Sequence, residues 1–195
     1  MAQRIIIALS ILIGTTIVLV INWPGVLRPP ATPVESTVKE APKDAVGGPF
    51  TLVDTDGNTV TQVSLQGHYS LIYFGFTHCP DVCPVSLQKM TEALKIAGNT
   101  GEKVLPVFIT VDPQNDTPGV MKTYVANFHP RFLALTGTPD SVKQAEEAYR
   151  VYAAKTEGND GMAHTDQIYL MDANGKYVTH FANDATAADI ANRLR

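Results

Sequence analysis

The sequence predicts an α/β domain with a mixed central sheet and flanking helices. Apolar runs typical of buried strands alternate along the chain with amphipathic stretches typical of helices. The last two expected strands, at 165–172 and 176–182, are separated only by Ala-Asn-Gly, which is typical of a hairpin turn. Alternating strands and helices build parallel neighbours, and a hairpin adds an antiparallel pair. The sheet is therefore expected to be mixed.

The expected elements begin at residue 50. Residues 50–60 are expected to form a hairpin around an Asp-Gly-Asn turn. The apolar runs at 70–76 and 104–112 are expected to be strands buried on both faces. The other expected elements are a helix at 82–98 that ends at Gly98, helices at 116–129 and 138–155 that begin at the Thr-Pro pairs 117–118 and 138–139, a short strand at 131–137 and a C-terminal helix at 186–195.

The chain begins with an uncharged apolar stretch at residues 5–21. As a helix it would span roughly 26 Å at ~1.5 Å per residue, close to the ~30 Å hydrocarbon core of a bilayer. Arg4 precedes it and Trp23 follows it, where a cytoplasmic positive charge and an interfacial aromatic residue would lie. We therefore expect residues 1–22 to be an uncleaved signal anchor forming one transmembrane helix, with a cleaved signal peptide as the alternative.

Residues 23–46 are rich in proline and show no apolar periodicity, which is typical of an extended stalk. The remaining residues, 47–195, are long enough for one domain with its own core. No stretch has the composition of an organelle transit peptide. We therefore expect a bacterial inner-membrane protein that crosses the membrane once, with its domain facing the periplasm. The formal net charge of −4 argues against nucleic acid as a partner.

Cys79 and Cys83 are the only cysteines in the chain, and three residues separate them. They follow the first long expected strand and stand where the next helix begins, which is the thioredoxin-like arrangement. In open α/β sheets, functional sites lie at the carboxyl ends of the strands. The pair is therefore expected to mark the functional site of a thioredoxin-like α/β domain.

A metal site, a redox couple and a structural disulfide are three alternative roles for this pair. Residues four apart on a helix face the same way, and the partial positive charge of a helix N-terminus favours thiolates, that of Cys79 above all. Thiolates select Cu(I) or zinc over hard cations. A disulfide across so short a loop would contribute only ~2 kcal/mol, and a core of this size does not need it. A metal or redox role is therefore favoured.

The five histidines include one candidate for a third metal ligand. His164 ends a glycine-containing loop just before an expected strand, a common place for a functional residue, although a loop histidine is often only solvated. Met162 is a candidate for a soft extra ligand, but a loop methionine usually packs. The other histidines are expected to lie in turns or loops, to face outward, or to point away from the neighbouring cysteine: His68, His129, His180 and His78.

The stretch Val-Asp-Pro-Gln-Asn-Asp-Thr-Pro, residues 111–118, joins an expected strand to an expected helix. Asp112 ends the strand, Asp116 and Thr117 lead into the helix, and the prolines set the turn. These structural roles account for every residue in the stretch. We expect it to have no catalytic role, although it can border the site.

The stretch Tyr-Phe-Gly-Phe-Thr-His-Cys-Pro-Asp-Val-Cys-Pro, residues 73–84, resembles the signature of the Sco/SenC family of copper-binding, thioredoxin-like proteins. Three further stretches, at 50–60, 109–118 and 164–175, agree with the family in order and spacing. The resemblance covers roughly residues 49–195, which is essentially the whole expected domain.

The resemblance implies one copper ion, as Cu(I) or Cu(II), held by Cys79, Cys83 and His164. It also implies a role in assembling the dinuclear copper centre of cytochrome c oxidase, whose copper-centre subunit would accept the copper. In the family an acidic residue usually precedes the histidine, whereas here Ala163 stands at that position. Asp166 is a candidate to orient the imidazole in its place.

Two functions remain open on this evidence. The first is a copper chaperone, which would not be an enzyme, anchored in the membrane. The second is a thiol–disulfide reductase, in which Cys79 attacks the target disulfide and Cys83 resolves the mixed disulfide. The extra residue relative to a Cys-x-x-Cys motif makes the reductase less expected. A peroxide reductase would need an arginine near the thiolate, and the cysteine loop contains none.

Overall fold

The structure is a computed structural model that describes residues 46–156 and 161–195. The anchor expected at 1–22 and nearly all of the stalk expected at 23–46 lie outside the described residues. Within the two described ranges, no helix combines the length and the apolar character needed to cross a membrane. The domain expected at 47–195 is described apart from four residues, 157–160.

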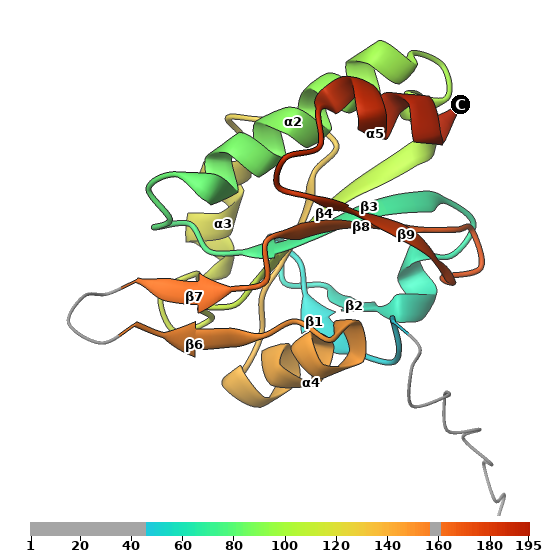
Figure 1. Ribbon diagram of the computed structural model, residues 1–195. Coiled ribbons are helices and arrows are strands. Elements are labelled where there is room, and N and C mark those ends of the chain that lie inside the picture. Colours follow the sequence, from blue (N-terminus) through green and yellow to red (C-terminus); the bar gives the residue numbers. More distant parts are fainter. Residues whose placement is uncertain (1–45, 157–160) are drawn as a thin grey trace, which may run out of the picture. The chain divides into compact units, whose positions relative to one another are not determined.

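A five-stranded sheet forms the centre of the domain (Figure 1) and consists of β3 (Tyr69–Gly75), β4 (Val104–Thr110), β5 (Leu133–Leu135), β8 (Gln167–Met171) and β9 (Tyr177–Ala182). The order across the sheet is β5-β4-β3-β8-β9. β3, β4 and β5 run parallel, whereas β8 pairs antiparallel with both β3 and β9. The mixed sheet predicted from the sequence is therefore confirmed.

The α-helices of the described residues are α2 (Val82–Ala97), α3 (Pro118–Val125), α4 (Pro139–Tyr149) and α5 (Ala187–Leu194). A threonine hydroxyl caps each of the last three by accepting a hydrogen bond from a backbone N–H of the first turn. α3 and α4 have proline in the first turn, as the Thr-Pro pairs predict. α2 and α5 pack together over one face of the sheet, and α4 lies at the other face (Figure 1). This is the thioredoxin-like α/β architecture.

A first hairpin, β1 (Thr51–Val53) and β2 (Thr59–Thr61), lies beside the central sheet. Its turn is organised by Asp54, whose carboxylate accepts hydrogen bonds from the backbone N–H groups of Asp56 and Asn58. The hairpin predicted at 50–60 is thus confirmed. Two short 3₁₀ turns, η1 (Gln62–Leu65) and η2 (Gly101–Lys103), lead into β3 and β4.

A second hairpin, β6 (Ala153–Lys155) and β7 (Met162–His164), was not predicted. The sequence predicts that the helix beginning at Thr138 continues to Lys155 and that residues 155–164 form a loop. Both predictions are wrong in part, because α4 ends at Tyr149, residues 153–155 form β6 and residues 162–164 form β7. Each strand has only three residues, too few for an alternation of polar and apolar side chains to show. The hairpin matters because its second strand ends at His164.

β3 carries the centre of the core, and its residues from Ser70 to Gly75 are buried. Successive side chains of a strand point to opposite faces. Tyr73 stacks on Phe108 with ring centroids 6.4 Å apart, whereas Phe74 contacts Tyr149 and Tyr169. Burial on both faces explains the continuous apolar run. The carboxyl end of this strand, which leads into the cysteines, is therefore held inside the core.

Candidate metal centre

The two cysteines lie at the junction of β3 and α2. Cys79 lies in the connecting loop, and Cys83 lies in the first turn of α2. The loop turns back at Cys79, whose N–H donates to the carbonyl of Phe76 at 3.3 Å. Cys79 is 8% exposed and Cys83 is 0% exposed. Both thiols thus stand at the carboxyl end of a central strand, where the sequence predicts the site.

A sulfur atom accepts a hydrogen bond from the backbone of the first turn of α2. Asp81 occupies the N-cap position but makes no side-chain capping bond. The N–H of Cys83 instead donates to Sγ of Cys79 at 3.4 Å. A helix N-terminus leaves several N–H groups without an intrahelical partner, and here one of them points at the Cys79 sulfur. This is the interaction through which a helix N-terminus favours a thiolate.

The Cys83 thiol is the more deeply placed of the two. The Tyr73 hydroxyl lies 3.8 Å from its sulfur. Burial raises the pKa of the Cys83 thiol far above its ordinary value, and the hydrogen bond with Cys79 raises it further. Cys83 is therefore protonated in the metal-free protein at neutral pH, and a metal ion that binds its sulfur displaces the proton.

His164, at the end of β7, completes a convergent group. Its Nε2 lies 3.4 Å from Sγ of Cys83, 81 residues away in the chain. Its Nδ1 lies 3.1 Å from the carbonyl oxygen of Thr165. A carbonyl can only accept, so Nδ1 carries a proton, and in the neutral tautomer Nε2 presents its lone pair to the sulfur. The rings of Tyr73 and Phe76 meet the imidazole edge to face, with centroids 6.0 and 5.8 Å from its own.

The ligand atoms of Cys79, Cys83 and His164 all lie within 4.8 Å of one another. Across the two described ranges, no other group of three His, Cys or acidic side chains comes together closely enough to share a metal ion. Two sulfurs and one imidazole nitrogen form a soft donor set, which suits copper or zinc better than a hard cation. The structure thus brings together the three residues singled out from the sequence.

Asp166 does not take the role considered for it from the sequence. Its carboxylate accepts a hydrogen bond from the Tyr73 hydroxyl at 2.9 Å and from the Ser86 hydroxyl at 3.4 Å. The imidazole is held instead by the Thr165 carbonyl. Asp166 therefore fixes the direction of the Tyr73 hydroxyl, whose oxygen lies 3.8 Å from the Cys83 sulfur. Sequence reasoning missed this link, although a tyrosine within a buried strand signals a hydroxyl that needs a partner.

The remaining candidates lie elsewhere. His180 is exposed on β9 and pairs with the Tyr177 hydroxyl. His78 directly precedes Cys79 in the chain, but its ring is exposed and contacts the Thr77 hydroxyl. Met162 packs against the core, as expected of a methionine in this segment.

Gly75 allows Cys83 to lie against β3. A methyl group at this position would stand 2.9 Å from the Cys83 sulfur and 2.9 Å from a ring carbon of Tyr73. We expect Gly75→Ala to lower the free energy of unfolding by about 1–3 kcal/mol because the overpacked core must shift. We also expect faster alkylation of Cys83. Denaturant unfolding and mass-spectrometric alkylation rates measure both effects.

Gly119→Ala is the matched control, because nothing lies within 4 Å of a methyl group there. The control is expected to match the wild type or to be slightly more stable, since alanine is favoured over glycine within a helix. If Gly75→Ala also behaved like the wild type, the close approach of Cys83 to β3 would be refuted.

Comparisons with known proteins show which family this chain resembles. The SCO1/SenC family model matches residues 38–195. An SCO2-like protein of Rickettsia felis is 41% identical over 199 residues, covering 98% of this chain and 95% of its own. ScoI of Bradyrhizobium japonicum, solved with copper bound, is 45% identical and superimposes with a TM-score of 0.71 over 77% of this chain and 98% of its own.

A more distant structure is also similar. BsSco, described as a member of the Sco family of cytochrome c oxidase assembly proteins and as containing a disulfide switch, is 27% identical with a TM-score of 0.63 over 77% of this chain and 94% of its own. The family model covers well over half of this chain, and the Rickettsia relative is similar over nearly all of it. This chain therefore belongs to the SCO1/SenC family.

Proposed function

We propose that this protein is a membrane-anchored copper chaperone that helps to assemble the dinuclear copper centre of cytochrome c oxidase. Copper is its cargo, and Cys79, Cys83 and His164 are the residues that hold one ion. The observation that carries the proposal is the convergence of their three ligand atoms within 4.8 Å. The copper-bound ScoI of Bradyrhizobium japonicum and the family description of BsSco support it.

The donor set suits both oxidation states of copper. Two thiolates and a neutral imidazole form a three-coordinate soft site for Cu(I), and the same ligands also bind Cu(II). The tautomer set by the Thr165 carbonyl leaves Nε2 of His164 available as the ligand. Binding releases the thiol protons.

Transfer to an acceptor requires a site that a partner protein can reach. Pro80 and Asp81, next to Cys79 in the loop, are exposed. The acceptor, the copper-centre subunit of the oxidase, docks over this loop, and copper passes by ligand exchange. The anchor at residues 1–22 confines donor and acceptor to one membrane surface and raises their effective concentration. The domain accordingly faces the periplasm from a single-pass bacterial inner-membrane protein.

Copper titration of the reduced full-length protein in detergent tests the proposal. The wild type is expected to retain one copper per chain and to show a thiolate-to-Cu(II) charge-transfer band. His164→Ala is expected to lose the copper or to shift that band, because one ligand of three is gone. His180→Ala is the control, since its exposed imidazole contacts Tyr177 and Tyr169 and none of the three proposed ligands. Wild-type binding by His164→Ala would refute the three-ligand site.

A thiol–disulfide reductase is the second candidate function. It is favoured by the two free sulfurs within 4.8 Å of each other, and BsSco is described as having a disulfide switch. The slightly exposed Cys79 thiolate would attack a target disulfide and release one target thiol. Cys83 would then attack the Cys79 sulfur, forming a disulfide within this protein and releasing the second target thiol, so two electrons reach the target. Because thiol exchange does not need His164, His164→Ala would spare reduction while it abolishes copper retention.

A further inference from the structure

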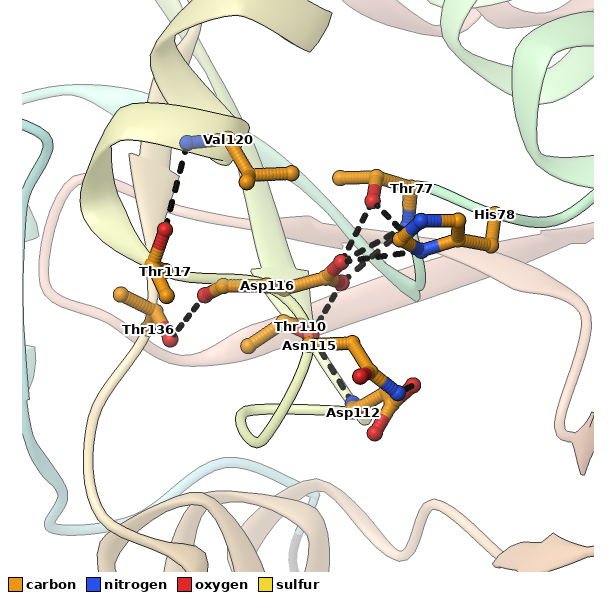
Figure 2. Close-up of polar contacts among 9 residues, drawn as sticks. All are labelled: Thr77, His78, Thr110, Asp112, Asn115, Asp116, Thr117, Val120 and Thr136. Atoms are coloured by element: carbon orange, nitrogen blue, oxygen red, sulfur yellow. Dashed lines mark hydrogen bonds and ion pairs between the residues drawn. The ribbon is translucent and has the colours of Figure 1, made fainter. Parts of the chain in front are cut away.

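Asp116 is a fully buried carboxylate beside the cysteine loop. It lies between β4 and α3, within the stretch 111–118 to which sequence analysis assigned only turn and capping roles. Figure 2 shows that the side chains of Thr77 and Thr110 point at its carboxylate from two different segments. A buried charge is costly unless hydrogen bonds satisfy it, so the partners of this carboxylate indicate what it does.

Both oxygens of the carboxylate accept hydrogen bonds from the cysteine loop or from β4. The N–H of Thr77 is shared between them, at 3.3 Å from Oδ1 and 3.1 Å from Oδ2. The Thr77 hydroxyl donates to Oδ1 at 2.5 Å, and the Thr110 hydroxyl donates to Oδ2 at 2.6 Å. The carboxylate thus joins the last residue of β4 to the residue two positions before Cys79.

The backbone of Asp116 is itself held in place. Its N–H donates to the Asp112 carbonyl at 2.9 Å, and its carbonyl accepts from the Thr136 hydroxyl at 2.7 Å (Figure 2). Thr117 then caps α3. The carboxylate therefore projects from a rigid segment, which is what a residue needs in order to position another.

Few other hydrogen bonds fix the cysteine loop, in which Phe76 and Cys79 are packed in the core. Within residues 76–81, the backbone bond of the loop to itself is the long one from Cys79 to Phe76, and Asp81 makes no side-chain cap. For these loop residues, the hydrogen bonds that the structure shows to segments other than α2 all end on Asp116. Thr77 is therefore the loop residue that hydrogen bonds connect to the rest of the domain beyond α2.

We propose that Asp116 is a positioning residue for the copper site. Through Thr77 it holds the loop that carries Cys79 in the conformation that metal binding needs, before the metal arrives. The inference deepens the proposed function and rests on it as far as copper is concerned. Its claim about the loop concerns the copper-free protein and stands separately.

The test compares Asp116→Asn and Thr77→Val with the wild type in the full-length protein. Asparagine keeps the size of the side chain but places an N–H₂ group where one carboxylate oxygen accepts. Valine keeps the N–H bond of Thr77 to Asp116 and removes the hydroxyl, with its bond to Asp116 and its contact with the exposed His78 ring. Asp189→Asn is the matched control, because the Thr186 N–H and hydroxyl bind its carboxylate in the same way, at 2.9 and 2.6 Å, but at the start of α5.

Two readouts separate positioning from general stability. The first is Cu(I) affinity by competition with a chelator, where we expect a loss of roughly 10- to 100-fold for Asp116→Asn, the range typical when a group that orients a ligand is removed. For Thr77→Val we expect a loss of roughly 3- to 10-fold, because one of the hydrogen bonds between Thr77 and Asp116 is removed and the others stay. The second is hydrogen exchange of the Thr77 amide in copper-free protein, which is expected to accelerate in Asp116→Asn. Asp189→Asn is expected to change neither.

The possible outcomes are distinguishable. Wild-type copper affinity and wild-type Thr77 exchange in a folded Asp116→Asn protein would overturn the inference. If Asp116→Asn does not fold, Thr77→Val decides, and an unchanged affinity in that variant overturns it. If the wild type itself retains no copper, the proposed function fails. Faster Thr77 exchange in copper-free Asp116→Asn would still support the positioning of the loop, and unchanged exchange would refute it.

Discussion

Replacing Cys83 with serine is expected to abolish copper retention by the folded protein. Cys83 is the central ligand of the proposed site, since its sulfur lies 3.4 Å from Nε2 of His164 and its N–H contacts Cys79. A hydroxyl is a hard, weakly acidic donor that Cu(I) does not select. The loss in affinity should exceed the roughly 100-fold that follows removal of a group that only orients a ligand. Bound copper after gel filtration against a chelator measures it.

The same variant should remain folded, which makes the result interpretable. Serine is slightly smaller than cysteine, and the Tyr73 hydroxyl lies beside position 83 and can hydrogen-bond the new oxygen. Gln88→Ala, on the exposed side of α2, is the control and should retain copper as the wild type does. Full stoichiometric binding by Cys83→Ser would show that this sulfur is not a ligand, and the proposed site would have to be abandoned.

Gly101→Ala is expected to be the most destabilising of the alanine substitutions considered. Gly101 begins η2, shortly after the end of α2 at Ala97, and a methyl group there would overlap the backbone carbonyl oxygen of Leu94. No side-chain rotation can relieve a clash with backbone, so the end of α2 must shift. We expect a loss of about 3 kcal/mol, at the upper end for overpacking. For a domain of this size that lowers Tm by roughly 6–12 °C.

Denaturant and thermal unfolding of the copper-free protein measure this effect. The shift also threatens a neighbouring contact, because the Gly101 carbonyl accepts a hydrogen bond from the Arg131 guanidinium at 2.9 Å. Gly119→Ala again serves as the comparison, since a methyl group at that position meets nothing within 4 Å. If Gly101→Ala unfolded at the same temperature and denaturant concentration as the wild type, the backbone after α2 would be able to move without a loss of stability.

The architecture and the place of the thiol pair followed from local patterns in the sequence. The apolar run of β3, the threonine caps and the Ala-Asn-Gly turn between β8 and β9 are properties of neighbouring residues, and neighbouring residues decide backbone conformation at turns and helix starts. The short hairpin of β6 and β7 was missed because three-residue strands carry no such pattern. The anchor predicted at 1–22 stays a prediction.

The sequence by itself determined a thioredoxin-like α/β domain with two thiols where a central strand meets a helix, and the family resemblance pointed to His164 as their partner. Only the tertiary structure decided how these residues act together. The Thr165 carbonyl orients the His164 ring so that Nε2 lies next to the Cys83 sulfur. The Asp166 carboxylate accepts a hydrogen bond from Tyr73, and the Asp116 carboxylate accepts one from Thr77. Apart from the His164–Thr165 contact, these contacts join residues distant in the chain, up to 93 positions apart for Tyr73 and Asp166, and depend on which strands become neighbours in the sheet. The periodicity of a sequence does not show which residues of different elements come into contact, because it describes one element at a time.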